Sequence, residues 1–207
     1  MKRSQVYVVC IFVLLLVAIM AARADAGILT NYSADMETTT AQGSFTTKVF
    51  SKDKKMRMER NRKGHSSINI LRPDKMLVWM LTVDNKTYTE IKLDSSMQDL
   101  QAKLLDANIK TEKEFIGNEV VDNHPTKKFH LTIITDGKRD KAGYIWEATA
   151  LGNFVVKHES EDKKITTVWK NIKTGGVSDS LFELPPGYTK MELPAMPGLG
   201  DILKQKH

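Results

Sequence analysis

The chain has 207 residues, with 31 Lys or Arg, 25 Asp or Glu and a formal net charge of +6. Its single cysteine, Cys10, lies near the N-terminus, which excludes a disulfide framework and a Cys-based zinc site. The basic excess is small. It indicates solubility or attraction to anionic lipid rather than a nucleic-acid partner.

The first 26 residues have the pattern of a cleaved export signal. Lys2 and Arg3 form a basic start, an apolar run covers 6–20, and Ala24 and Ala26 are small residues suited to cleavage. The run is shorter than the roughly 20 residues of a spanning helix, and an uncleaved anchor is the alternative. We predict a periplasmic protein with a cleaved signal peptide at 1–26, one LolA-like β domain (the resemblance is given below) at 27–190 and a flexible tail at 191–207.

Turn-forming residues recur about every ten positions after residue 32, which is the rhythm of an antiparallel β domain. Between the turns, apolar and polar side chains alternate, as Met56 and Met58 do with Lys55, Arg57 and Glu59. The predicted turns of this meander are 41–43, 52–54, 61–64, 72–75 and 83–86.

The run 76–81 is continuously apolar and of strand length, which predicts a strand buried on both faces. Val78 and Met80 would share one face, and Trp79 would lie on the other. Such a strand needs cover on each side, so we expect other elements to pack over this part of the sheet.

Residues 95–108 break the β pattern and predict an amphipathic helix. Ser95 followed by Gln98 matches a capping box. One apolar stripe runs along the helix, formed by Met97, Leu100, Leu104 and Leu105. We expect the helix to lie on the sheet, where it either completes a packed core or covers a space for a ligand.

A second β pattern follows from about residue 115 to residue 169, with turns at 122–125, 136–139 and 152–153. Beyond it, prolines and glycines prevent long strands. The predicted fold class is mainly β, a curved antiparallel sheet (an incomplete barrel) of about ten strands wrapped around one central α-helix.

Four stretches resemble the LolA/LolB-type lipoprotein-carrier superfamily, and more specifically an exported bacterial family of unknown function within it. They are the basic–methionine alternation at 55–59, the turn 72–75 leading to Val78 and Trp79, Tyr88 in the returning strand, and Leu-Phe-Glu-Leu-Pro-Pro-Gly-Tyr at 181–188. The resemblance implies a LolA-like incomplete barrel with a helix lid over an apolar cavity, which holds acyl chains in superfamily members. The absence of a lipidated cysteine separates this chain from the membrane-anchored LolB branch.

The sequence contains no catalytic or metal-binding motif. Neither a Gly-x-Ser-x-Gly elbow nor a His-x-x-x-His pair occurs, and cleavage of the signal would remove the one thiol. The five histidines are scattered over separate strands and turns, at His65, His124, His130, His158 and His207. We therefore expect a protein that is not an enzyme and holds neither a metal nor a cofactor.

Methionine is the more informative residue type, with ten in the chain. Three interpretations remain open: simple filling of the core, a deformable lining for an apolar ligand, and thioether capture of Cu(I), which lacks supporting His or Cys. The predicted lining of an apolar cavity is Met56, Met58, Ile68, Ile70, Val78, Met80, Leu100 and Leu104.

These patterns predict an exported, non-enzymatic binding protein that holds an apolar ligand, a lipid or an acyl chain, between sheet and helix. The alternative is an envelope sensor or protein-interaction module with a filled core. The expected partners are a lipid or lipoprotein acyl chain, or an envelope protein. No nucleic acid and no transmembrane span after signal cleavage are expected.

Overall fold

The computed structural model describes residues 29–93, 110–135 and 137–192. The predicted signal peptide at 1–26, the predicted helix at 95–108 and nearly all of the predicted tail at 191–207 lie outside these residues. The described chain is mainly β, as the sequence predicts, and most of its strands fall into two meanders.

In the first meander each strand pairs antiparallel with the next. Its strands are β1 (Tyr32–Thr40), β2 (Gly43–Lys52), β3 (Lys55–Arg62), β4 (His65–Arg72), β5 (Leu77–Thr82) and β6 (Thr87–Lys92). The turns lie where the sequence predicts them. Between β2 and β3, Asp53 and Lys54 have φ values of 49° and 68°, and two successive positive φ values match the twist of a hairpin.

The second meander is built in the same way. Its strands are β7 (Lys110–Val121), β8 (His124–Thr135), β9 (Lys138–Ala148), β10 (Phe154–Glu159) and β11 (Thr166–Thr174). Asp122 and Asn123 form the first turn with φ values of 46° and 63°. This meander begins at residue 110, earlier than the sequence pattern indicates.

A seam between β1 and β11 joins the two meanders into one sheet. The pairing is antiparallel, with Met36 opposite Trp169, and its register shifts between Ser33 and Asp35. On β11 near this shift, Asn171 has a φ of 53°. Its backbone N–H donates to Asp122 at 2.8 Å and its side-chain amide donates to Asp35 at 2.8 Å.

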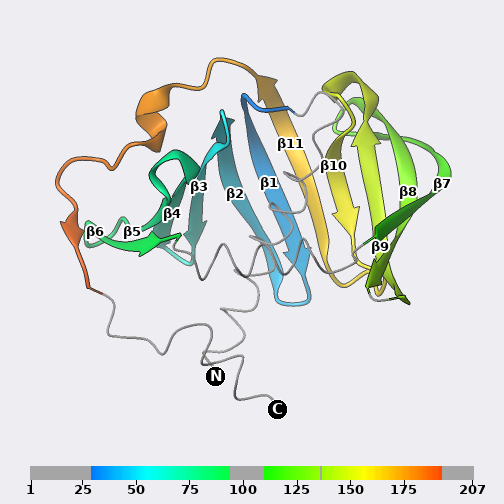
Figure 1. Cartoon of the computed structure of the whole chain (residues 1–207), viewed down its shortest axis with the longest axis horizontal. Coiled ribbons are helices and arrows are strands. Elements are labelled where there is room, and N and C mark those ends of the chain that lie inside the picture. Colours follow the sequence, from blue (N-terminus) through cyan, green and yellow to red (C-terminus); the bar gives the residue numbers. More distant parts are fainter. Residues whose placement is uncertain (1–28, 94–109, 136, 193–207) are drawn as a thin grey trace, which may run out of the picture.

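After β11 the chain crosses the first meander as a segment that we call the strap, residues 175–190 (Figure 1). It contains a short 3-10 helix, η3 (Asp179–Phe182), and a two-residue strand, β12 (Thr189–Lys190), which pairs parallel with β6. Backbone N–H groups of Thr189 and Met191 donate to the carbonyls of Lys86 and Tyr88 at 2.9 and 2.8 Å. The strap thereby ends at an edge of the sheet.

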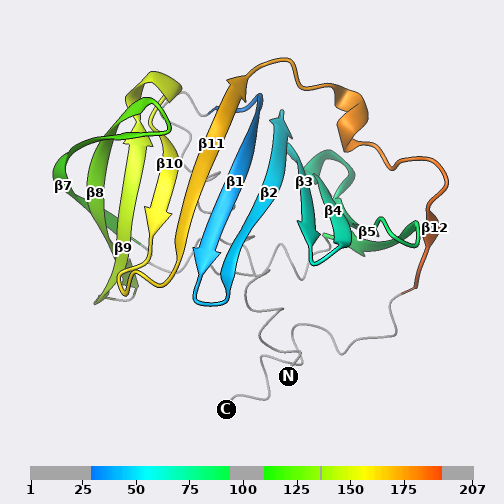
Figure 2. The same cartoon turned by 180° about the vertical axis from the view of Figure 1, so that it is seen from behind.

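The described residues form one 12-stranded sheet in the order β12-β6-β5-β4-β3-β2-β1-β11-β10-β9-β8-β7. Figures 1 and 2 show it from opposite sides, twisted and curved, with the two meanders next to each other. The sheet is open, antiparallel except at β12, and has two strands more than the ten predicted. The helices within the described residues are the 3-10 turns η1 (Pro73–Lys75), η2 (Thr149–Leu151) and η3. The described residues give no support to the predicted central α-helix, because residues 95–108 lie outside them.

The prediction that the run 76–81 is buried on both faces is wrong. In β5, Trp79 and Leu81 are 8% and 2% exposed, whereas Met80 between them is 44% exposed. Met76 lies outside the strand and takes a left-handed conformation with a φ of 52°. A continuous apolar run conceals the two-residue period that distinguishes the faces, so the sequence could not show which face is covered.

Candidate functional site

One face of the first meander, which we call the methionine face, carries two rows of side chains without a formal charge. Residues that pair across antiparallel strands project to the same side of a sheet, so the register defines these rows from β1 to β6. They are Tyr32, Ser51, Met56, Leu71, Val78 and Ile91, and next to them Ala34, Val49, Met58, Asn69, Met80 and Thr89.

The methionine face continues across the seam onto the second meander. Met56 and Met58 pack against a buried cluster formed by Tyr32, Ala34, Met36 and Val49, together with the partly buried side chains Leu29, Phe154, Trp169 and Ile172. The ring of Phe154 lies 5.2 Å from that of Tyr32 and 6.0 Å from that of Trp169, both edge to face. Burial raises the pKa of Tyr32 to about 12, so the phenol stays neutral in this apolar setting.

The structure divides the predicted apolar lining between the two faces of the sheet. Met56, Met58, Val78 and Met80 lie on the methionine face. Ile68 and Ile70 lie on the opposite face, because Ile70 pairs with Arg57 and not with either methionine. Leu100 and Leu104 lie outside the described residues. The strand register therefore excludes a single cavity lined by all six of these described side chains.

The opposite face, which we call the strap face, has an apolar core under the strap. Ile70, Trp79 and Leu81 from the sheet pack against Val177 and Phe182 from the strap, and Phe182 has no exposed surface. The indole N–H of Trp79 donates to Glu90 at 3.1 Å, and this hydrogen bond, followed by one from Lys190, lowers the pKa of Glu90. The strap is thus the cover that the sequence predicts for Trp79.

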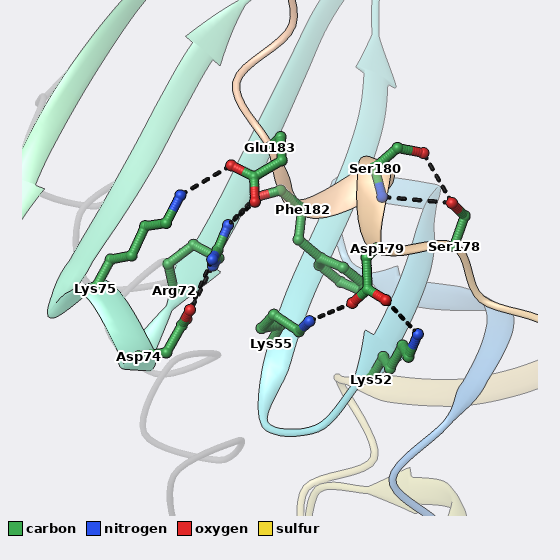
Figure 3. A network of polar contacts seen from close by, with 10 residues as sticks. All are labelled: Lys52, Lys55, Arg72, Asp74, Lys75, Ser178, Asp179, Ser180, Phe182 and Glu183. Atoms are coloured by element: carbon green, nitrogen blue, oxygen red, sulfur yellow. Dashed lines mark hydrogen bonds and ion pairs between the residues drawn. The ribbon is translucent and has the colours of Figure 1, made fainter.

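Two carboxylates of the strap bind cations of the sheet, and we call these contacts the latch (Figure 3). Asp179 forms ion pairs with Lys52, at 2.5 Å, and with Lys55. The hydrogen bonds from these two ammonium groups lower the pKa of Asp179 to about 2. The ammonium of Lys55 also lies 5.3 Å from the ring centroid of Phe182, within the range of a cation–π contact.

The second half of the latch is centred on Arg72. Its guanidinium is 7% exposed and forms ion pairs of 2.6 Å with both Asp74 and Glu183. Glu183 also binds Lys75 at 2.9 Å, and these cations lower its pKa. Arg72 lowers the pKa of Asp74 to about 2. A buried guanidinium with carboxylates on two sides keeps its charge compensated.

Two arginines of the sheet also bind the strap backbone. Arg57 donates to the carbonyl of Leu181 at 3.0 Å, and Arg72 donates to the carbonyl of Phe182 at 2.9 Å. Arg57 is buried and pairs with Glu59 at 2.6 Å. Consecutive carbonyls of the strap are therefore satisfied by side chains rather than by a strand ladder.

Sequence reasoning missed the latch and the strap that it holds. The stretch 181–188 is recognisable as a motif, but nothing local indicates where it packs, since Asp179 and Lys52 are 127 residues apart. The available signal was chemical: acidic residues lie on both sides of Phe182, and basic residues gather at the turns 52–55 and 72–75.

The second meander has a polar cluster around a buried tryptophan. Trp146 is 1% exposed, and its indole N–H donates to Glu119 at 2.7 Å. The ammonium groups of Lys157 and Lys128 lie 4.0 and 4.7 Å from its ring centroid. The hydrogen bond from Trp146, then that from Lys128, lowers the pKa of Glu119. These contacts bury Trp146 beneath two lysine side chains.

The histidines that the structure describes do not form one site. His130 and His158 pair with neighbouring residues of β9, Tyr144 and Ile145, and so project to opposite faces. Burial lowers the pKa of His158. Within residues 29–93, 110–135 and 137–192, no group of three His, Cys, Asp or Glu side chains is placed to hold a metal ion.

The surface of the described structure has shallow depressions, among them a larger and a smaller one. The larger has a volume of about 430 Å³ and lies on the strap face near Lys48, Glu59 and Ile68. The smaller, of about 290 Å³, lies between β7 and β8 near Val120 and Pro125. Among the described helices, none has the length and apolar character needed to cross a membrane.

The fold and the two faces define a class, that of open β-sheet proteins in which one face carries two uncharged rows of side chains and the other is closed by a strap. The chain belongs to the family described as "Domain of unknown function (DUF4412)", whose sequence profile matches residues 33–155. This match begins in β1 and ends in β10, so β11 and the strap lie beyond it. Among curated proteins, no sequence matches the chain.

Solved structures show a likeness of fold. A crystal structure of an uncharacterized conserved protein from Thermus thermophilus has 11% identity and a TM-score of 0.54, covering 80% of this chain and 91% of that one. A crystal structure of MucB in complex with MucA(peri) has 9% identity and a TM-score of 0.36, covering 75% of this chain and 54% of that one. The first supports the fold alone, and the second is too distant to support an inference. The resemblance to LolA/LolB-type carriers stays a prediction.

Proposed function

We propose that the protein is an exported, non-enzymatic binding protein that holds an apolar ligand, a lipid or acyl chain, against the methionine face. One observation carries the proposal: two rows of that face cross six strands without a formal charge. Covering such a surface with hydrocarbon removes apolar area from water at about 25 cal/mol per Å². A charged group of a ligand placed against these two rows would lose its hydration without gaining a partner of opposite charge from them.

The side chains on this face suit a ligand of variable shape. Thioethers are flexible and polarizable, and they adapt to irregular apolar surfaces. Met80 is 44% exposed, while Met56 and Met58 are partly buried. The methionine side chains therefore extend from the packed cluster to the surface. The proposed contacts on the first meander are therefore Met56, Met58, Val78 and Met80. The resemblance to acyl-chain carriers supports the same ligand class, and the predicted export signal at 1–26 fits an exported protein.

The test begins with the protein as it is isolated. Organic extraction of natively purified protein, followed by mass spectrometry, is expected to release a lipid or fatty acid. A fluorescent fatty acid should then bind the delipidated protein. Met58→Gln places an amide in the middle of the face and is expected to weaken dye binding about tenfold. Met191→Gln is the matched control, because Met191 is 51% exposed and lies at the end of the strap.

A lipid-free protein that also ignores the dye would contradict the proposal. Equal dye affinities for the Met58 and Met191 variants would show that the ligand binds elsewhere.

A second function is an envelope sensor or interaction module with a filled core. Burial at the centre of the methionine face favours it, since Ala34, Met36 and Val49 are 5%, 8% and 3% exposed. In that case Met58→Gln would lower stability while the parent protein binds no dye. A pull-down from an envelope fraction would then recover a specific protein partner.

A further inference from the structure

The strap face contains a socket for one aromatic side chain between positive charges. Phe182 fills the socket, which Ile70, Trp79 and Leu81 line. Five cations of the sheet surround the socket: Lys52, Lys55, Arg57, Arg72 and Lys75. Two of these cations, the arginines, also have carboxylate partners outside the strap: Glu59 pairs with Arg57, and Asp74 of η1 pairs with Arg72. The ion pairs that the structure gives for the three lysines are with the strap.

The surface beneath the strap therefore binds a defined set of chemical groups. It binds carboxylates at positions 179 and 183, an aromatic ring at 182, and the carbonyls of Leu181 and Phe182 through two guanidinium groups. The carbonyl contacts do not depend on side-chain identity. An acidic segment that takes the same 3-10 turn, with one aromatic residue in this spacing, offers the same groups.

The strap is held in a way that permits exchange. Gly175 and Gly176, with φ values of 77° and 72°, lie at its start, and added Cβ atoms there would meet no neighbour within 4 Å. Asp179 and Glu183 are 62% and 53% exposed, and exposed ion pairs contribute little net stability. The backbone hydrogen bonds that the structure gives between the strap and the rest of the described chain lie at its two ends, from Gly175 to the carbonyl of Asn31 at 2.7 Å and at β12.

A surface depression lies next to the core under the strap. The depression of about 430 Å³ on this face includes Glu59 and Ile68. Ile68 also packs against the core under the strap, and Glu59 is the partner of Arg57. The depression therefore adjoins the core under the strap at Ile68.

We propose that the surface beneath the strap is a docking site for an acidic segment of a partner protein that takes the same 3-10 turn as η3, with an aspartate, a phenylalanine and a glutamate in the spacing of 179, 182 and 183. The strap is its intramolecular competitor. The complementary charges and the single aromatic socket define this occupant. The site lies on the face opposite the proposed lipid surface, so the two proposals fail independently.

The probe is a fluorescein-labelled peptide that carries Asp-Ser-Leu-Phe-Glu in a Gly/Ser background, and fluorescence anisotropy measures its binding to the full chain. Asp179→Asn with Glu183→Gln weakens the competitor while leaving Phe182 and every residue of the surface beneath the strap unchanged. This double variant is expected to bind the peptide about three- to tenfold more tightly than the parent protein, because each exposed carboxylate contributes only a small part of the closure of the strap. Replacing the peptide's phenylalanine by alanine, or both carboxylates by amides, should abolish the gain. Raising the salt concentration should reduce the binding of the acidic peptide.

Equal affinity of the parent and the double variant, or equal binding of all three peptides, would overturn the proposal. A stable dimer of the double variant without peptide, seen by size-exclusion chromatography, would also overturn it, because the occupant would then be the strap of a second copy. Circular dichroism checks the fold of each variant. If the double variant does not fold, Asp179→Asn alone provides the same comparison at an exposed position.

Discussion

The two faces of the first meander are built from alternate residues of the same strands, yet their side chains differ in chemical character. On β3, Met56 and Met58 project to one side, and Lys55, Arg57 and Glu59 project to the other. The methionine face carries flexible apolar side chains, which suit the proposed apolar ligand. The strap face holds carboxylates and a ring at fixed positions. Because successive residues of a strand project to opposite sides, one sheet has two surfaces of different chemistry.

The largest effect that would test this comparison is the loss of the ring under the strap. Phe182→Ala removes a fully buried side chain and is expected to lower the free energy of unfolding by about 3 to 5 kcal/mol, measured by urea denaturation. Phe115→Ala is the control, because Phe115 is 53% exposed, and it should cost less than about 1 kcal/mol. A cost below about 1 kcal/mol for Phe182→Ala would show that the strap adds nothing to the core.

A smaller effect compares the faces directly on neighbouring strands. Ile70→Ala on the strap face should cost about 2 to 5 kcal/mol, because Ile70 is fully buried. Met80→Ala on the methionine face should cost less than about 1 kcal/mol, since Met80 is 44% exposed. Urea unfolding of the two variants gives both values. Similar costs would mean that the two faces are equally packed at this point.

The smallest effect is the dependence of the latch on pH. The pKa of Asp179 falls from 3.8 to about 2 because of hydrogen bonds from Lys52 and Lys55, and hydrogen bonds from Lys75 and Arg72 lower the pKa of Glu183. Since the folded values lie below the unfolded ones, both carboxylates stabilise the closed strap fully above about pH 5. The contribution of Asp179 disappears as the pH falls from about 4 to about 2.

Resonances of the Phe182 ring, followed by NMR at low salt, are expected to shift over this interval. In Asp179→Asn the shift should be smaller, because one of the two carboxylates no longer titrates. A ring that moves only above pH 5 would be inconsistent with these pKa values.

Most of the local structure follows from the sequence. The turns at 52–54 and 61–64 are marked by Asp, Asn and Gly residues that tolerate positive φ, and Asp53, Lys54, Lys63 and Gly64 have such values. Alternation on β3 predicts that Met56 and Met58 share one face, as the register confirms. These predictions succeed because hairpins depend on residues close in sequence.

The long-range contacts could not be predicted in this way. The pairing of β1 with β11 involves no turn residues that connect them. The position of Phe182 depends on a socket formed by Ile70, Trp79 and Leu81, about 100 residues earlier. The sequence assigns Ile68 and Ile70 to the methionine side because both are apolar, whereas the register of β4 against β3 decides their face. Apolar character alone does not distinguish a core under a strap from a ligand surface.

The seam between β1 and β11 has a consequence for how the chain folds. Met36 must find Trp169, so the central pairing closes only when almost the whole chain is available. Hairpins within each meander form from local contacts, but such a distant pairing carries a large loop-closure entropy and slows folding. Until then β1 presents an unpaired edge, and exposed edges recruit strands from other molecules. The completed seam removes this edge, which makes β11 the element that protects the nascent sheet from aggregation.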